Sequence, residues 1–323
     1  LKELPEPLQP VVARCLEKDP DLRYPNAAAL REALEAALPG RTRSDPNVDE
    51  CPYPGLVAFQ EEDADRFYGR DPDIRAGRAR LRQHPLLAVV GPSGVGKSSY
   101  VQAGLIPALK ATGDAWESRS VRPGRQPLAA MARLLASLED ADPERLESML
   151  RDEPHVAGRL LRERARQRES GLVVYVDQFE ELYTQGASGE ERLLFSRVLM
   201  SIADDPASPL RVVLSIRSDL LDRVSEAPDF ASLLLEGAFL LRPPTTAGLR
   251  DALVQPLEGV GYRFEFDELV EEMLDDAGDD DAVLPLLQFS ASLLWERRDS
   301  QARVLSRQAY REITRTYQLT LEA

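Results

Sequence analysis

A glycine-rich stretch at residues 91–99, GPSGVGKSS, constrains this chain more than any other feature. It follows an apolar run at 86–90 and leads into a helical pattern. Its spacing fits G-x-x-x-x-G-K-[ST], beginning at Gly91 and ending at Ser98. Glycines let the backbone curl so that N–H groups point at phosphate oxygens, and the N-terminus of the next helix adds positive potential. We therefore predict that residues 91–99 form a phosphate-binding loop, the phosphate loop.

The phosphate loop predicts a role for each of its residues. Lys97 is expected to neutralise the β- and γ-phosphates, and the Ser98 hydroxyl to be a ligand of Mg²⁺. The remaining contacts are expected from Gly91, Ser93, Gly94, Val95, Gly96 and Ser99. The predicted cofactors are thus ATP or ADP with Mg²⁺. A plain glycine-rich turn is the alternative, but it does not explain the strand before, the helix after and the Lys-Ser pair together.

Composition excludes several other classes of function. The chain has 323 residues and a net charge of -15. This negative charge argues against general binding to nucleic acids or to anionic membrane surfaces. Two cysteines cannot form a disulfide framework, so we expect a cytoplasmic protein. Two histidines leave little for a histidine metal cluster or a Ser-His-Asp triad. No apolar run approaches the length of a membrane span, so no membrane segment is expected.

The order of apolar runs and helical patterns predicts the fold class. Five strand-like runs lie at 86–90, 116–122, 172–177, 212–216 and 238–241. Their alternation with helical patterns predicts an α/β fold, with a five-stranded parallel P-loop sheet flanked by helices. We place this nucleotide-binding core at 51–242. After Pro243 and Pro244 the pattern is helical, which predicts a helical lid at 243–323.

The third apolar run, LVVYVD at 172–177, is the second element of a phosphate site. A buried strand that ends in an aspartate is the Walker B pattern, and Asp177 is expected to hold Mg²⁺ through water beside Ser98. A catalytic carboxylate should lie nearby to activate the attacking water. The next residue is Gln178, so that role falls to Glu180 or Glu181, and the choice between them stays open. Alternatively, both only favour the N-terminus of a helix.

An arginine ends the fourth apolar run. In a P-loop sheet, the strand beside the phosphate-loop strand can carry a polar sensor residue at its carboxyl end. The guanidinium of Arg217 could contact the γ-phosphate there and so distinguish ATP from ADP. The alternative is a surface arginine followed by Asp219, which caps the next helix.

The first 38 residues predict a pair of helices that is too small to fold alone. Their sequence CLEKDPDLR at 15–23 resembles that of the last helices of the C-lobe of bacterial Ser/Thr protein kinases. The resemblance implies a kinase upstream, of which 1–38 is the C-terminal end, followed by a linker at 39–50. The HRD and DFG motifs of kinases are missing from this sequence, so no kinase activity is expected from the chain itself. An unrelated helical pair is the alternative.

Further sequence motifs resemble those of the novel STAND branch of bacterial signal-transduction ATPases. They are CPYPGL at 51–56, FYGR at 67–70, the phosphate loop, RPGRQPL at 122–128, VDQFEEL at 176–182 and IRSD at 216–219. The resemblance covers residues 51–320 and implies a regulated switch, closed with ADP and self-associated with ATP. It also implies a sensor domain downstream, and at the end of this chain the start of a winged-helix domain.

The same resemblance adds residues on the adenine side of the site. It implies that Tyr68, Gly69 and Arg70 lie beside the adenine and that Pro285 packs on it, although Val283 stands where glycine is usual. The expected function is a slowly hydrolysing ATP switch that couples nucleotide state to oligomerisation and to an attached kinase. The alternative is a nucleotide-gated scaffold that assembles kinase domains without hydrolysis.

Overall fold

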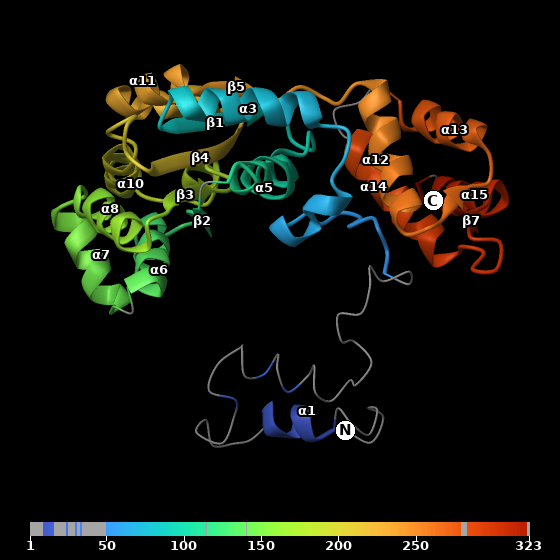
Figure 1. Ribbon diagram of the computed structural model, residues 1–323, viewed down its shortest axis with the longest axis horizontal. Helices are drawn as coiled ribbons and strands as arrows, with labels where there is room; N and C mark the ends of the chain where they lie inside the picture. Colours follow the sequence, from blue (N-terminus) through green and yellow to red (C-terminus); the bar gives the residue numbers. More distant parts are fainter. Residues whose placement is uncertain are drawn as a thin grey trace. The chain divides into compact units, whose positions relative to one another are not determined.

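The computed structural model describes residues 9–15, 24, 30, 33, 50–113, 115–139, 141–278 and 283–321 (Figure 1). The chain divides into two compact units, Leu1–Glu50 and Cys51–Ala323. In the first unit, helix α1 spans Gln9–Cys15. Most of the kinase-like segment, including Arg23, and the linker up to residue 49 lie outside the described residues.

The second unit is built on a five-stranded sheet in the order β2-β3-β4-β1-β5, and all of its paired strands are parallel. The strands are β1 (Leu86–Gly91), β2 (Trp116–Val121), β3 (Gly171–Val176), β4 (Leu210–Arg217) and β5 (Ala238–Leu240). The predicted α/β fold and its five strands are therefore confirmed, with small shifts at strand ends. Every residue of β1 is buried, as expected for a parallel sheet that is covered on both faces.

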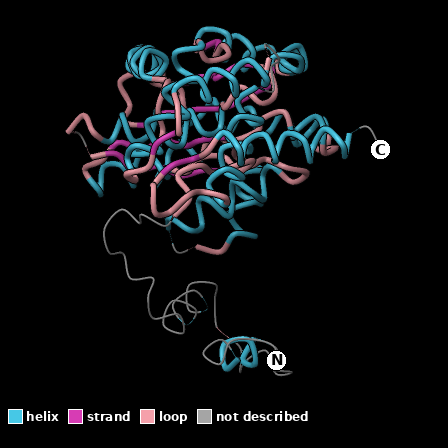
Figure 2. Tube along the Cα trace, turned by 90° about the vertical axis from the view of Figure 1, so that its right-hand side faces the viewer, coloured by secondary structure: helices cyan, strands magenta, loops and turns pink. Residues whose placement is uncertain are grey.

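Helices cover the two faces of this sheet in separate layers, and Figure 2 shows the strands enclosed by helices. Side chains of β1 alternate between the layers, because successive residues of a strand point to opposite faces. Leu87 and Val89 pack with one layer, and Leu86, Ala88 and Val90 pack with the other. The first layer is formed by α3 (Asp71–Gln83) and by the helical run after the phosphate loop, which comprises α4 (Lys97–Ser99), the π-helical η4 (Tyr100–Leu105) and α5 (Ile106–Lys110).

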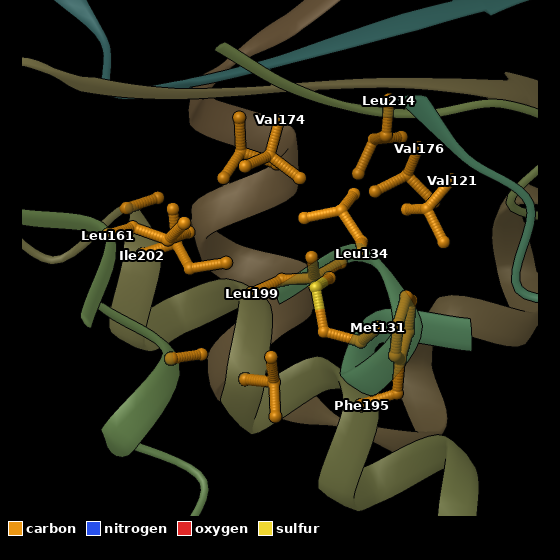
Figure 3. Packing of buried hydrophobic residues seen from close by; sticks show 14 of the residues in the cluster. Val121, Met131, Leu134, Leu161, Val174, Val176, Phe195, Leu199, Ile202 and Leu214 are labelled. Atoms are coloured by element: carbon orange, nitrogen blue, oxygen red, sulfur yellow. The ribbon is translucent and has the colours of Figure 1, made fainter. Parts of the chain in front are cut away.

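The opposite layer contains the largest core cluster of the described residues. Its helices are α6 (Pro127–Glu139), α7 (Pro143–Asp152), α8 (Val156–Arg168), α10 (Gly189–Ile202) and α11 (Pro228–Glu236). Figure 3 shows Met131, Leu199 and Phe195 beneath the strand residues Val176 and Leu214. Three short helices, η3 (Glu61–Arg66), α9 (Glu181–Thr184) and η5 (Ser218–Glu226), lie in the connections. This apolar layer covers the face of the sheet to which Leu86, Ala88 and Val90 of β1 point.

Residues 243–278 and 283–321 form the predicted helical subdomain, seen at the orange-to-red end of Figure 1. Its helices are α12 (Thr246–Gly259), α13 (Asp267–Ala277), α14 (Val283–Glu296) and α15 (Arg307–Leu321). The sequence did not predict its small parallel pair, β6 (Arg263–Phe264) with β7 (Val304–Leu305). The subdomain has its own apolar core, which Tyr53 joins from the N-terminal side. Among the described residues, no helix combines the length and the hydropathy needed to cross a membrane.

Candidate functional site

A cavity of about 230 Å³ opens between the phosphate loop, residues 54–59 and 66–70, and the helical subdomain. Of the predicted site residues, those that line it are Ser93, Gly94, Gly96, Lys97, Ser98, Ser99, Tyr68, Gly69, Arg70, Glu180, Arg217 and Pro285. Gly91, Val95, Asp177 and Glu181 are not among the lining residues. The chain thus brings most of its candidate binding residues to one hollow, although they come from segments far apart in the sequence.

The phosphate loop is shaped by glycines in the left-handed region. Gly94 has φ +82° and Gly96 has φ +88°, values that other residues adopt only with strain. The ammonium of Lys97 donates to the carbonyls of Gly91 at 2.9 Å and Pro92 at 2.7 Å, so it lies across the loop. Burial lowers the pKa of Lys97, while the nearby carboxylate of Glu180 opposes that shift. Lys97 is therefore a partly buried cation at the floor of the cavity.

Ser98 and Asp177 meet at the carboxyl edge of the sheet. The Ser98 hydroxyl donates to Asp177 Oδ1 at 2.7 Å, and the hydroxyls of Tyr175 and Ser215 donate to the same oxygen at 2.6 and 3.1 Å. Burial opposes ionisation of Asp177, but hydrogen bonds from Tyr175, Ser98 and Arg122 hold its pKa below the ordinary value. Asp177 is thus a buried, fixed carboxylate.

This pair fits a magnesium ion. A hydroxyl and a carboxylate are the hard oxygen ligands that Mg²⁺ prefers, and Mg²⁺ usually takes its other ligands from water and substrate phosphates. The described residues contain no group of three or more His, Cys, Asp or Glu side chains able to hold a metal. Ser98 and Asp177 would therefore hold Mg²⁺ together with a nucleotide and not by themselves.

Sequence reasoning missed Arg122 as a member of this site. Arg122 follows β2, and its Nε and Nη2 donate to Asp177 Oδ2 at 3.1 and 2.9 Å. The cause is the strand register, in which Val121 pairs with Val176 and so brings the next residues of both strands together. An arginine at the end of the strand-like run at 116–122 was the available signal, but it gains meaning only once β2 and β3 are known to be neighbours.

The two candidate carboxylates occupy different environments. Glu181 Oε2 accepts a hydrogen bond from the backbone N–H of Gly124 at 3.2 Å, which ties it to the loop after β2. Glu180 lines the cavity, and its Oε2 is buried with no hydrogen-bond partner among the described residues. Burial raises the pKa of Glu180, with Lys97 acting in the opposite direction. A desolvated carboxylate of a residue that lines the cavity has the environment of a general base, whereas Glu181 is hydrogen-bonded to the loop after β2.

The residue between Asp177 and Phe179 is in an unusual conformation. Gln178 has φ +54°, and its backbone N–H donates to the Ser215 hydroxyl at 2.9 Å. This left-handed step turns the chain sharply at the strand end, which lets the buried ring of Phe179 enter the core while Glu180 reaches the cavity. Strained residues of this kind gather at functional sites.

Arg217 ends β4, the strand that pairs with β1, and lies opposite Gly91. Its guanidinium donates to both carboxylate oxygens of Asp219, at 3.0 and 2.7 Å, and it lines the cavity. The structure therefore places Arg217 at the expected height beside the phosphate loop, in an ion pair with Asp219.

Arg70 also lines the cavity and connects several backbone segments. It is 4% exposed, and its guanidinium donates to the carbonyls of Val95 at 2.6 Å and Arg242 at 2.7 Å and to Asp73 at 3.0 Å. Its donors are thus directed at protein acceptors, and they brace the phosphate loop against the end of β5. Pro285 lies in the first turn of α14 and contributes an apolar wall.

Gly69 makes a close backbone approach to the helical subdomain. Its φ is +82°, and a Cβ placed there would lie 2.1 Å from the carbonyl oxygen of Gly248 in α12. Only glycine fits at this crossing, and Tyr68 lines the cavity next to it. This contact places α12 against the FYGR motif at residues 67–70.

Several solved structures have a similar fold. The ORC2 protein of Aeropyrum pernix in its ADPNP-ADP complexes has a TM-score of 0.52 at 15% identity, covering 75% of this chain and 66% of its own. Drosophila ORC bound to DNA has a TM-score of 0.54 at 15% identity, covering 85% and 67%. A Walker-type ATPase of Pyrococcus abyssi has a TM-score of 0.51 at 13% identity, covering 81% and 76%. These identities show the fold alone.

The comparison with protein families goes further. None of the curated proteins compared with this chain matched it. The model of the family Novel STAND NTPase 1, however, matches residues 52–318, which include the phosphate loop, Asp177 and the helical subdomain. Because that match covers most of the sequence and agrees with the fold, the chain belongs to the Novel STAND NTPase 1 family.

Proposed function

We propose that this chain is an ATP-dependent signalling switch that binds ATP or ADP with Mg²⁺ and hydrolyses ATP slowly. The observation that carries the proposal is the 2.7 Å hydrogen bond between Ser98 and Asp177, which joins two predicted Mg²⁺ ligands from distant parts of the sequence. The left-handed Gly94 and Gly96 and the partly buried cation of Lys97 would form a cradle for phosphates beside that pair.

Binding would use the residues of the cavity in the following way. A triphosphate would displace the ammonium of Lys97 from the carbonyls of Gly91 and Pro92, because phosphate oxygens are stronger acceptors for a cation. Mg²⁺ would neutralise phosphate charge between Ser98 and Asp177. The base would lie toward Tyr68, Gly69 and Pro285, on the apolar side of the cavity.

Hydrolysis would depend on Glu180. Its buried carboxylate faces the cavity, and its raised pKa favours proton uptake from an attacking water. Glu181 would support the loop that carries Arg122 through its bond to Gly124. Arg217, once released from Asp219, would contact the γ-phosphate and distinguish ATP from ADP.

The output of the switch would be a change of assembly state. We propose that the ATP-bound form self-associates and that this brings together protein kinase domains joined upstream, under the control of a sensor domain downstream. The kinase-like words at 15–23 and the STAND family support this layout. A cytoplasmic setting is consistent with the two cysteines, which are free thiols in the structure, and a bacterial origin with the resemblance of the motifs. The net charge of -15 disfavours nucleic acid as a partner.

Substitution of the loop lysine tests the proposal. Lys97→Ala should abolish binding of ATP and ADP in calorimetric titrations, because the loop loses its only cation directed at the phosphates. Lys110→Ala is the matched control, since Lys110 pairs with Glu61 and Ser118 and does not line the cavity. Wild-type affinity in Lys97→Ala would refute nucleotide binding by this loop.

A non-hydrolysing scaffold is the second candidate, and Gln178 favours it. Many ATPases with this motif carry an acidic residue where this chain has Gln178. Single-turnover hydrolysis with Glu180→Gln and Glu181→Gln separates the two candidates. A switch with slow turnover should lose roughly a hundredfold or more in rate in Glu180→Gln, and Glu181→Gln should have the smaller effect. No effect in either variant would support the scaffold.

A further inference from the structure

Gln288 lies in the wall of the proposed nucleotide cavity, and its buried side-chain amide has one unsatisfied oxygen. Its side chain is 5% exposed, and its Oε1 has no hydrogen-bond partner among the described residues. An unpaired buried acceptor destabilises a protein, because it has lost its hydrogen bonds with water without replacement. Since Gln288 lines the cavity, the missing donor would come from a ligand there.

The orientation of the Gln288 amide is fixed by a proline in the neighbouring helix. Pro256 lies inside α12 and has no backbone N–H, so the carbonyl of Ala252, four residues earlier, has no partner within the helix. Gln288 Nε2 donates to this carbonyl at 3.3 Å. A carbonyl can only accept, so the nitrogen must face Ala252 and the oxygen must point elsewhere.

The position of Gln288 places it on the base side of the site. Gln288 and Pro285 are three residues apart on α14, and residues at this spacing lie on one face of a helix. Both line the cavity, together with Gly248 and Ala252 of α12. The phosphate-binding Lys97 belongs to the sheet core and not to this helical subdomain. A nucleotide bound at the phosphate loop would thus extend its base toward α12 and α14.

We propose that Gln288 selects the base of the nucleotide by accepting a hydrogen bond from the exocyclic 6-amino group of adenine. Adenine carries a donor at this position, whereas guanine carries an acceptor, the O6 oxygen. Guanine would set two acceptors against each other and leave both without a partner. Sites that are built to pair with one polar group reject analogues without it strongly, because their own buried group is then left unpaired. This inference rests on the proposed nucleotide binding and adds the residue that reads the base.

Nucleotide analogues test the inference on the unaltered chain. The wild-type protein is titrated calorimetrically with ADP, with GDP, and with purine riboside diphosphate, which has hydrogen in place of the 6-amino group. ADP should bind roughly tenfold or more tightly than either analogue, the discrimination expected for one buried polar group left unpaired. Equal affinity for ADP and purine riboside diphosphate would overturn the role of the 6-amino group.

A substitution then assigns the selectivity to Gln288. Gln288→Met keeps the side-chain length and removes the acceptor, so it should reduce the preference for ADP over purine riboside diphosphate to about onefold to threefold. Gln255→Met is the matched control, because Gln255 is an exposed glutamine of α12 that does not line the cavity. It should retain the wild-type preference.

The two proposals fail in different ways. If the wild-type chain binds none of these nucleotides, both nucleotide binding and base selection are wrong. If it binds ADP and the preference survives in Gln288→Met, nucleotide binding stands and the role of Gln288 is refuted. If Gln288→Met does not fold, the analogue affinities of the wild-type chain still decide whether an acceptor reads the 6-amino group.

Discussion

The guanidinium of Arg122 and the carboxylate of Asp177 form an ion pair at the carboxyl edge of the sheet, with nitrogen–oxygen distances of 3.1 and 2.9 Å. Asp177 is almost fully buried, while 57% of the Arg122 side chain is exposed. The arginine therefore covers the carboxylate from the solvent side. A guanidinium and a Mg²⁺ ion are both cations, so they would compete for the negative charge of Asp177.

This competition predicts the effect of removing the guanidinium. Arg122→Ala should lower the Mg²⁺ concentration at which ADP binding is half-maximal by about threefold to tenfold, because a charge-assisted bond to Asp177 no longer has to be broken. The measurement is a calorimetric ADP titration at a series of Mg²⁺ concentrations. Arg125→Ala, an exposed arginine in the same loop, is the control. An unchanged or higher Mg²⁺ requirement in Arg122→Ala would show that the two cations do not compete.

The buried carboxylate of Glu180 predicts a pH-dependent stability. Burial raises the pKa of Glu180 in the folded state. The contribution of this group to the free energy of unfolding is therefore fully present below the ordinary pKa of a glutamate, and it is lost as the pH rises through the folded-state pKa. Glu180→Gln removes the buried charge, so its Tm should exceed that of the wild type at neutral pH, and the difference should shrink as the pH is lowered. Thermal unfolding by circular dichroism from pH 4 to pH 8 measures this. Glu163→Gln, at an exposed position of α8, is the control, and a difference in Tm that does not vary with pH would contradict the expectation.

The close approach of Gly69 to α12 predicts a large loss of stability in Gly69→Ala. The new methyl group would lie 2.1 Å from the carbonyl oxygen of Gly248, and the backbone has φ +82°. Backbone strain and clash together should destabilise the chain by about 2–4 kcal/mol. Gly113→Ala separates the two causes, since Gly113 has φ +91° but nothing within 4 Å of the new methyl group. It should lose only about 1 kcal/mol from strain. Equal losses in urea unfolding would mean that the contact with α12 contributes nothing.

The ion pair between Arg217 and Asp219 predicts a change in nucleotide preference. Asp219→Asn should weaken the hold on the guanidinium and so raise the affinity for ATP relative to ADP by about twofold to fivefold, the scale of an exposed ion pair. Binding of ADP and of a non-hydrolysable ATP analogue, compared in both proteins, measures this ratio. Asp222→Asn is the control, because Asp222 is an exposed aspartate of the same helix η5, whereas the guanidinium of Arg217 pairs with Asp219. A ratio unchanged by Asp219→Asn would argue against a γ-phosphate contact by Arg217.

The parts of the structure that the sequence predicts well are those defined by local pattern. The strand-like runs coincide with all five strands, and the short motifs lie where these strands end, the phosphate loop after β1 and Asp177 after β3. The helices of the C-terminal subdomain are also visible as periodic apolar patterns, whereas the two-residue strands β6 and β7 are too short to leave one.

The residues that the sequence does not reveal depend on which segments become neighbours. Arg122 reaches Asp177 because β2 and β3 pair in a particular register, and no local pattern contains that pairing. Gln288 gains its orientation from a carbonyl of α12 that Pro256 leaves free, which requires α12 and α14 to be in contact. Glu180 and Glu181 are adjacent in sequence and differ only because one faces the cavity and the other bonds Gly124. Their roles remain predictions.

The Tyr53 hydroxyl donates a hydrogen bond to the Leu253 carbonyl at 2.5 Å, which attaches the short segment after Glu50 to helix α12. Tyr53 is embedded in the core of the helical subdomain, and six residues later the backbone N–H of Phe59 donates to Ser99 of the phosphate loop at 3.1 Å. The segment is therefore a tether of fixed length between the subdomain and the nucleotide site. A rotation of the subdomain away from the phosphates would have to break the hydrogen bond between Tyr53 and Leu253 or the one between Phe59 and Ser99.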